Sequence, residues 1–114
     1  MENYKNWLGK KVEVKVDRRL GSRHPKYKDL IYEVNYGYIP GTKSIADNEE
    51  IDAYVLGVDK PIDKYSGIIT AVIKRSTGDQ EIKLIVTNGT IYTDEEINKL
   101  VDFQEKYFKS KIIK

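Results

Sequence analysis

Residues 67–87 read GIITAVIKRSTGDQEIKLIVT, and this stretch decides the class of fold. Gly67–Lys74 is rich in β-branched and apolar residues without a break, which is typical of a strand buried on both faces. Ser76–Gln80 holds a glycine among small polar residues and predicts a hairpin turn. Glu81–Thr87 predicts the returning strand. The stretch therefore indicates a β-hairpin in the core.

Three more strands and one helix are expected around this hairpin. Lys11–Asp17 alternates polar and apolar residues with period two, as a half-buried strand does. Leu30–Tyr36 and Ile51–Val58 have strand-like composition. Thr93 begins a helix, because Thr93 and the glutamate three residues later form a capping-box pattern. The apolar residues that follow, mostly at helical spacing, are Ile97, Leu100, Val101, Phe103, Tyr107 and Phe108.

The predicted fold class is mainly β (α+β), a small OB-like five-stranded β-barrel with a C-terminal helix. The pattern alone does not separate a barrel from a sandwich. The chain has 114 residues, of which 39% are hydrophobic and 33% charged. This length and composition suit one globular domain over residues 1–114.

Composition excludes several classes of protein. The chain has no cysteine, so it has no disulfide framework, thiolate metal site or cysteine nucleophile. The first residues, MENYKNWLGKK, contain no long apolar region, and no apolar stretch is long enough to span a bilayer. We therefore expect a cytoplasmic protein that engages no membrane. The oligomeric state, including a homo-oligomer, stays open.

Charge is nearly balanced in number but uneven in position. There are 20 Lys and Arg and 18 Asp and Glu residues. Bases gather in 10–23 and 106–114, and acids gather in 47–52. A nucleic-acid binder is expected to show a basic face without a central acidic cluster. We therefore expect no nucleic-acid partner.

The acidic cluster lies in SIADNEEIDAYVLG, residues 44–57. Its four carboxylates, Asp47, Glu49, Glu50 and Asp52, fall within six residues at the mouth of a strand. Mg²⁺ prefers such hard oxygen ligands, and Asn48 can adopt the left-handed conformation that would turn them toward one point. The alternative is a solvated acidic loop.

Two other segments place charges on shared strand faces. Glu81 and Lys83 point to one face, with Asp79 beside them, and could hold a metal and its phosphate. Lys11 and Glu13 share a face of the first strand, ahead of Arg18, whose guanidinium can clamp phosphate. Each set has a simpler interpretation as exposed ion pairs or an ordinary polar face.

The aromatic residues and the single histidine carry weaker signals. Tyr36 and Tyr38 flank Gly37, and their hydroxyls could donate to phosphate, although most of the nine tyrosines are expected in the core. His24 precedes a proline in a loop and is interpreted as structural.

These motifs together resemble the soluble inorganic pyrophosphatases of the OB-barrel type (family I). NYGYIPGT, DNEEIDAYVLG, the KPI turn, GIITAVIKR and EIKLIVT carry the resemblance, which spans residues 11–108. The short bacterial members are most similar, because they share segments like 17–25 and 103–108.

The resemblance implies hydrolysis of pyrophosphate to two phosphates with Mg²⁺. It implies Asp47 and Asp52 as metal ligands, with Asp52 bridging two metals. Glu49 would orient or deprotonate the attacking water, and Tyr36 would lie near it. Further implied metal ligands are Glu13, Asp79 and Glu81; the implied phosphate-binding residues are Lys11, Arg18, Lys83, Tyr107 and Lys109.

The sequence also departs from the family pattern. Ser76 falls near a position where longer members have an aspartate, and Lys109 is displaced by one residue because Phe108 follows Tyr107. Asn48 replaces a glycine. Two alternatives therefore stay open: a catalytically weakened pyrophosphatase-like barrel, and an OB-type module for single-stranded nucleic acid.

Overall fold

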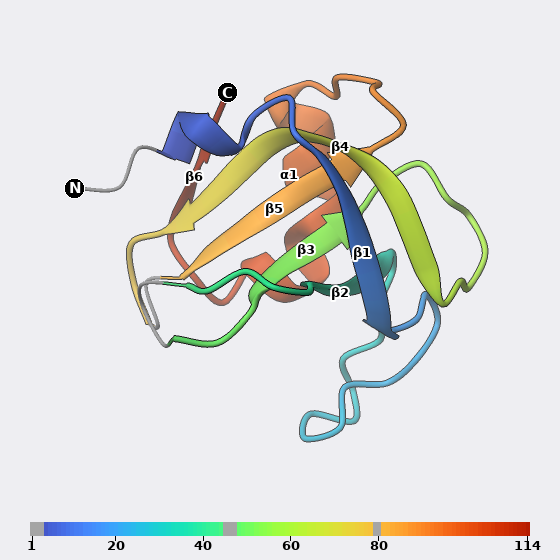
Figure 1. Ribbon diagram of the computed structural model, residues 1–114. Coiled ribbons are helices and arrows are strands. Elements are labelled where there is room, and N and C mark those ends of the chain that lie inside the picture. Colours follow the sequence, from blue (N-terminus) through green and yellow to red (C-terminus); the bar gives the residue numbers. More distant parts are fainter. Residues whose placement is uncertain (1–3, 45–47, 79–80) are drawn as a thin grey trace.

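The computed structural model describes residues 4–44, 48–78 and 81–114. Within them, six strands, one α-helix and one short 3-10 helix follow one another (Figure 1). In chain order the elements are η1 (Tyr4–Trp7), β1 (Lys11–Arg18), β2 (Asn35–Ile39), β3 (Ile51–Val55), β4 (Lys64–Arg75), β5 (Ile82–Thr87), α1 (Asp94–Glu105) and β6 (Ser110–Ile113).

The strands close into a five-stranded barrel, which confirms the predicted OB-like class. They are hydrogen-bonded in the order β1-β2-β3-β5-β4, and β4 pairs back onto β1. β4 serves several neighbours because it is 12 residues long. Residues 64–68 of β4 pair with β1, and residues 68–74 pair with β5. The β4–β5 pairing has a register shift between Ile69 and Ala71. Pairing of β3 with β5 is parallel, and the other pairings are antiparallel.

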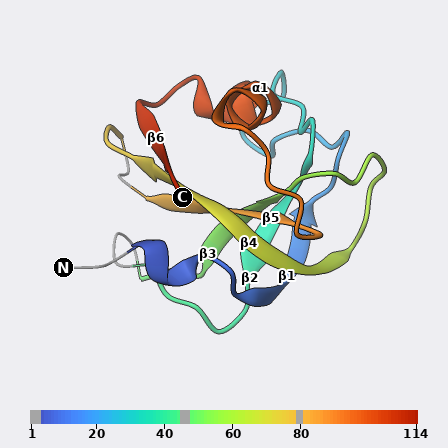
Figure 2. The same cartoon turned by 90° about the horizontal axis from the view of Figure 1, so that it is seen from above.

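Alternation along the strands builds two cores, one inside the barrel and one under the helix. The interior core is aliphatic and includes Val14, Ile51, Ala53, Ile69 and Leu84. The second core lies between the outer face of the sheet and α1, which covers one side of the barrel (Figure 2). It is aromatic, with Tyr32, Tyr36, Tyr54 and Phe103 among its members. The residues of the outer face that α1 does not cover are available to form a functional site.

The helix begins as predicted and ends earlier than predicted. Thr93 Oγ1 accepts from the Glu96 amide at 3.1 Å, and Glu96 Oε1 accepts from the Thr93 amide at 2.9 Å. This reciprocal pair confirms the capping box. The α-helix ends at Glu105, so Tyr107 and Phe108 lie beyond it.

The strand predicted at Leu30–Tyr36 was wrong in its bounds. The strand is Asn35–Ile39, and 30–34 lies outside it, apart from an isolated bridge at Ile31. Tyr32 exchanges backbone hydrogen bonds with the preceding loop, at 2.9 Å to Ser22 and 2.7 Å from Gly21. Tyr32 is buried under the helix rather than inside the barrel. The hydrophobic residues in 30–34 therefore belong to a loop that packs against the core, and not to a strand.

Gly37 sets how closely two strands of the barrel approach. A Cβ atom at this position would lie 1.9 Å from the backbone oxygen of Lys15. Gly37 pairs with Val16 where the register between β1 and β2 shifts. Only glycine allows this close approach of the backbones.

Two elements were absent from the expectation, η1 and the C-terminal strand β6. β6 pairs antiparallel with the end of β4.

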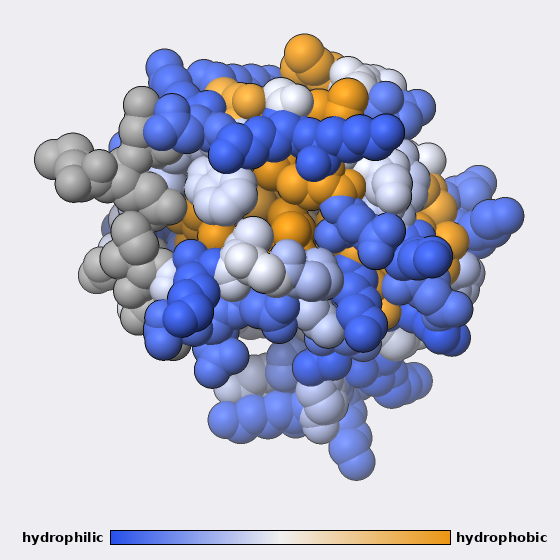
Figure 3. Space-filling view, in the orientation of Figure 1, coloured by the Kyte–Doolittle hydropathy of each residue, from blue (hydrophilic) through white to orange (hydrophobic). Residues whose placement is uncertain are grey.

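In the view of Figure 3, hydrophobic residues show in the middle of the face and hydrophilic ones surround them. None of the helices within the described residues has the length and apolar content needed to cross a membrane.

Candidate active site

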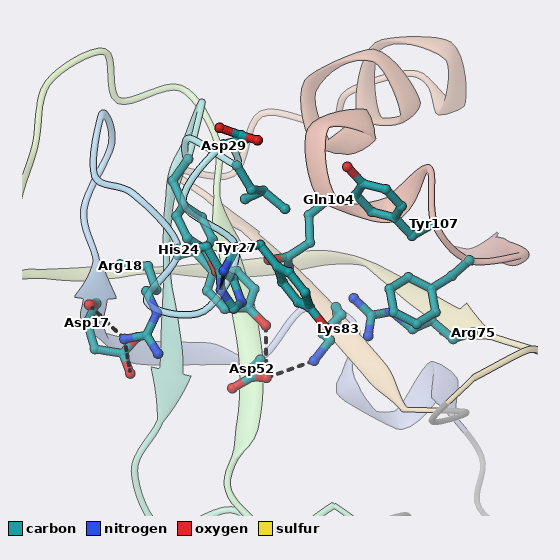
Figure 4. Close-up of a pocket in the computed structure, with 14 residues that line it drawn as sticks. Asp17, Arg18, His24, Tyr27, Asp29, Asp52, Arg75, Lys83, Gln104 and Tyr107 are labelled. Carbon is teal, nitrogen blue, oxygen red and sulfur yellow. Dashed lines mark hydrogen bonds and ion pairs between the residues drawn. The ribbon is translucent and has the colours of Figure 1, made fainter.

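Three side chains from neighbouring strands meet on the outer face of the barrel. Asp52 on β3 is the Cα partner of Lys83 on the parallel strand β5. Lys83 Nζ donates to Asp52 Oδ2 at 2.7 Å, and the hydroxyl of Tyr36 on β2 donates to the same oxygen at 2.9 Å (Figure 4). Asp52 points outward because Ile51 and Ala53 on either side of it point into the barrel.

Lys83 also holds a second carboxylate. Its ammonium donates to Glu81 Oε2 at 2.5 Å. Lys83 is only 3% exposed, and a buried ammonium requires such partners because its desolvation is costly. With both carboxylates ionised, the three groups carry one net negative charge. Two carboxylates therefore share the one ammonium of Lys83.

Tyr36 remains a proton donor in this cluster. Burial raises the pKa of its hydroxyl well above the ordinary value, and the adjacent Asp52 carboxylate raises it further. Its ring packs against Tyr54, with centroids 4.9 Å apart. A neutral hydroxyl fixed in this way can donate a hydrogen bond to an oxygen anion at neutral pH.

Tyr36, Asp52 and Lys83 form the floor of a cavity of about 760 Å³. Arg18 and Asp17 at the end of β1 line one side, and Tyr107, beyond α1, lines another (Figure 4). Burial raises the pKa of Asp17, and the charge of Asp52 contributes in the same direction. Asp17 is therefore close enough to Asp52 for the charge of Asp52 to act on it.

A second buried network fixes the wall of this cavity, and sequence reasoning missed it. Arg75 donates to Glu105 through Nε at 3.0 Å and through NH2 at 2.6 Å. Glu105 Oε2 also accepts from Tyr54 at 2.5 Å, and Gln104 donates to the Tyr54 hydroxyl at 2.8 Å. The ring of Phe108 lies 3.8 Å from the Arg75 guanidinium. The network ties the end of α1 to β3 and β4.

His24 lines the cavity as a neutral ring. Its Nδ1 accepts from the backbone amides of Lys26 and Tyr27 at 3.0 and 3.1 Å. Burial lowers the pKa of His24, and the cations Arg18 and Lys26 lower it further. The proton of the neutral ring is therefore assigned to Nε2, which makes His24 a donor rather than a base.

The predicted site residues divide into three groups. Tyr36, Asp52, Lys83 and Glu81 are brought into direct contact, and Arg18 and Tyr107 line the same cavity. Glu81 contacts Lys83 but does not line the cavity. The remaining described ones do not line it either: Lys11, Glu13, Glu49 and Lys109. Asp47 and Asp79 lie outside the described residues.

The four predicted residues that neither line the cavity nor contact Lys83 are all exposed. Lys11 and Glu13 occupy the outward face of β1. Glu49 follows Asn48, whose φ of 62° confirms the left-handed turn. The Lys109 backbone amide donates to Thr77 Oγ1 at 2.9 Å, which places this residue beside the β4–β5 hairpin.

The carboxylate oxygens of the cluster are of the type that binds divalent cations such as Mg²⁺. Asp52 is partly exposed to the cavity, and none of the described residues donates a hydrogen bond to its Oδ1. Carboxylate oxygens are the ligands that Mg²⁺ takes, with water completing its shell. Over residues 4–44, 48–78 and 81–114, however, three acidic or histidine side chains nowhere converge on one point. Lys83 lies between Asp52 and Glu81 instead.

Comparison with known proteins gives the fold. No protein-family model and no curated protein sequence matches the chain. Among solved structures, inorganic pyrophosphatase from Ehrlichia chaffeensis superposes with a TM-score of 0.69 and 17% identity, over 91% of this chain and 85% of that one. The enzyme from Coxiella burnetii gives 0.65 and 13%, over 92% and 84%.

An inorganic pyrophosphatase from Neisseria gonorrhoeae gives a TM-score of 0.64 at 18% identity, over 87% of this chain and 74% of that one. In each case most of both chains is matched, so the likeness covers the barrel and the helix together. The chain has the fold of the bacterial family I inorganic pyrophosphatases.

Proposed function

We propose that this protein is an inorganic diphosphatase that hydrolyses pyrophosphate to two phosphates with Mg²⁺. One observation carries the proposal: Tyr36, Asp52 and Lys83 converge at the floor of the cavity, in a fold shared with inorganic pyrophosphatases. The family resemblance implies a role in this chemistry for each of these residues. Their convergence from three strands supports the assignment.

The proposed central metal ligand is Asp52, at the cavity floor. The other ligands that the family resemblance implies are Asp47, Asp79, Glu81 and Glu13, of which the two described ones, Glu81 and Glu13, do not line the cavity. When bound, Mg²⁺ supplies an activated water and neutralises phosphate charge. The cluster of Asp52, Glu81 and Lys83 carries net negative charge without it, so metal binding removes a repulsion that would otherwise oppose the substrate.

The chain's own residues supply binding and proton handling. Lys83 and Arg18 present cationic donors to phosphoryl oxygens, and Tyr107 is a further proposed phosphate contact in the cavity. Lys11 and Lys109, which do not line the cavity, are proposed as outer phosphate contacts. Such fixed donors stabilise the charge that builds on the leaving phosphate. The Tyr36 hydroxyl donates a hydrogen bond near the attacking oxygen. Glu49 is the proposed residue that orients the water or takes its proton.

The test is phosphate release from pyrophosphate, measured with Mg²⁺ and again with excess EDTA. We expect turnover only with Mg²⁺, and a loss of at least ~10²-fold in Asp52→Asn. Asp63→Asn is the matched control, because Asp63 is an exposed carboxylate that pairs with Arg19 on the surface. Absence of metal-dependent release from the wild-type protein would overturn the proposal.

The same preparation separates the two alternatives. Pyrophosphate binding without turnover would indicate a catalytically weakened barrel. Binding of a fluorescent single-stranded oligonucleotide, lost at high salt, would indicate a nucleic-acid module. We expect neither result.

A further inference from the structure

The buried polar network in the cavity wall exceeds what packing requires. Tyr54 is 0% exposed and belongs to the core under α1, a position that an apolar side chain of similar size could fill. Arg75 and Glu105 are buried as well, and a buried ion pair is often no more stabilising than apolar residues of similar volume. Gln104 and Arg75 line the cavity itself (Figure 4). The network therefore lies where it can act on the site.

The hydroxyl of Tyr54 is held at both its proton and its oxygen. It donates to Glu105 Oε2 at 2.5 Å and accepts from Gln104 Nε2 at 2.8 Å. Burial raises the pKa of this hydroxyl well above its ordinary value, and the charge of Glu105 raises it further, so the hydroxyl keeps its proton. Arg75 in turn donates twice to Glu105. The end of the Tyr54 ring is thus tied to the last two residues of α1.

The ring of Tyr54 packs against the ring of Tyr36. The two residues are Cα partners on β3 and β2, and their ring centroids lie 4.9 Å apart at an interplanar angle of 59°. The ring of Tyr32 also contacts Tyr36, with centroids 5.5 Å apart. Because a phenol ring turns about its side-chain bonds, the contacts along the ring decide where its hydroxyl lies.

We infer that Tyr54 is a positioning residue that holds the Tyr36 hydroxyl on Asp52 Oδ2 through the contact between the two rings. This inference rests on the proposed function, in which the Tyr36 hydroxyl donates near the attacking oxygen. That hydroxyl lies 2.9 Å from Oδ2, the oxygen to which Lys83 also donates, and such a bond weakens steeply when its angle is lost. Tyr54 does not line the cavity, so its effect passes through Tyr36.

Two substitutions break the tether from different ends. Tyr54→Phe keeps the ring and deletes the hydroxyl, and Gln104→Leu removes one of the two hydrogen bonds. Tyr54→Phe should lower kcat for pyrophosphate about ten-fold, since a misplacement of about 1 Å can cost about 10²-fold. KM should stay near the wild-type value, because Lys83 and Arg18 keep their positions. Gln104→Leu should show the same pattern with a smaller loss. Tyr65→Phe is the control, since Tyr65 is partly buried and lies outside the cavity.

A double-mutant cycle separates positioning from a general structural effect. The Tyr36→Phe protein has no hydroxyl left to position, so adding Tyr54→Phe should not lower kcat further. The same fold loss in both backgrounds overturns the inference. A Tyr54→Phe protein with the kcat of the wild type overturns it as well.

A second measurement requires no turnover. NMR of protein with isotope-labelled tyrosine rings gives the flip rate of the Tyr36 ring, whose signals are identified by their loss in Tyr36→Phe. The ring should flip faster in Tyr54→Phe than in the wild type or in Tyr65→Phe, and an equal rate overturns the inference. If the wild type releases no phosphate from pyrophosphate, the proposed function fails, and the flip rate still decides whether Tyr54 restrains Tyr36.

Discussion

Replacing Glu105 by glutamine tests whether the buried pair with Arg75 holds the helix on the barrel. Arg75 is 3% and Glu105 6% exposed, so solvent screens their interaction little. The substitution keeps the size of the side chain but removes the charge that Arg75 contacts through two nitrogens. It also weakens the acceptor for the Tyr54 hydroxyl.

The expected cost follows from this burial. Removing one partner of a buried ion pair costs about 3–5 kcal/mol, because the charge that stays in the interior loses the interaction with that partner. Since about 1 kcal/mol shifts the melting temperature of a small domain by several degrees, the drop should be on the order of 10–20 °C. Urea unfolding followed by circular dichroism measures the free energy directly.

A surface pair and a double substitution are the controls. Asp63→Asn breaks the Arg19–Asp63 pair, whose side chains are largely exposed, and should cost less than about 1 kcal/mol. Replacing both Arg75 and Glu105 by methionine should cost less than the single substitution, because neither charge of this pair remains in the interior. A Glu105→Gln protein as stable as Asp63→Asn would refute the reasoning.

Four further outcomes are expected. Mg²⁺ in the millimolar range should raise the melting temperature of the wild-type protein, by linkage to the folded state, and should not raise that of Asp52→Asn; an equal shift in both proteins would remove Asp52 from the metal site. Thr93→Ala should cost about 1 kcal/mol in urea unfolding, because it breaks the capping box; an unchanged midpoint would contradict this. Hydrogen bonds from Thr93 lower the pKa of Glu96, so the stability that Glu96 contributes is present above its unfolded pKa and is lost as pH falls through the folded pKa. Glu96→Gln should therefore lower the urea midpoint more at neutral pH than in acid. Gly37→Ala should cost about 3 kcal/mol or more, since its methyl group would overlap the Lys15 carbonyl; near-native stability would show that β1 and β2 can separate at low cost.

Local chemistry explains which expectations were met. The β4–β5 hairpin and the capping box are encoded within short windows, because strand periodicity and side-chain capping depend on residues a few positions apart. The outward position of Asp52 is set in the same way by its apolar neighbours Ile51 and Ala53. These features could be predicted before any contact between distant segments was known.

The loop before β2 and the last strand were not accessible in this way. Tyr32 has the composition of a strand residue, but it packs under α1 and its backbone bonds to Ser22. β6 is short, and its strand conformation depends on the free edge at the end of β4. In both cases the decisive partner is far away in sequence or belongs to another layer.

By itself, then, the sequence determined a β-rich chain, its capped helix and the outward direction of the acidic and basic side chains. The tertiary structure alone decided that Asp52 faces Lys83, 31 positions away, across a parallel pair, and that Arg75 meets Glu105 in the wall of the cavity. The physical reason is that side-chain direction follows from local backbone geometry. The register between strands, by contrast, depends on which edges meet when the barrel closes.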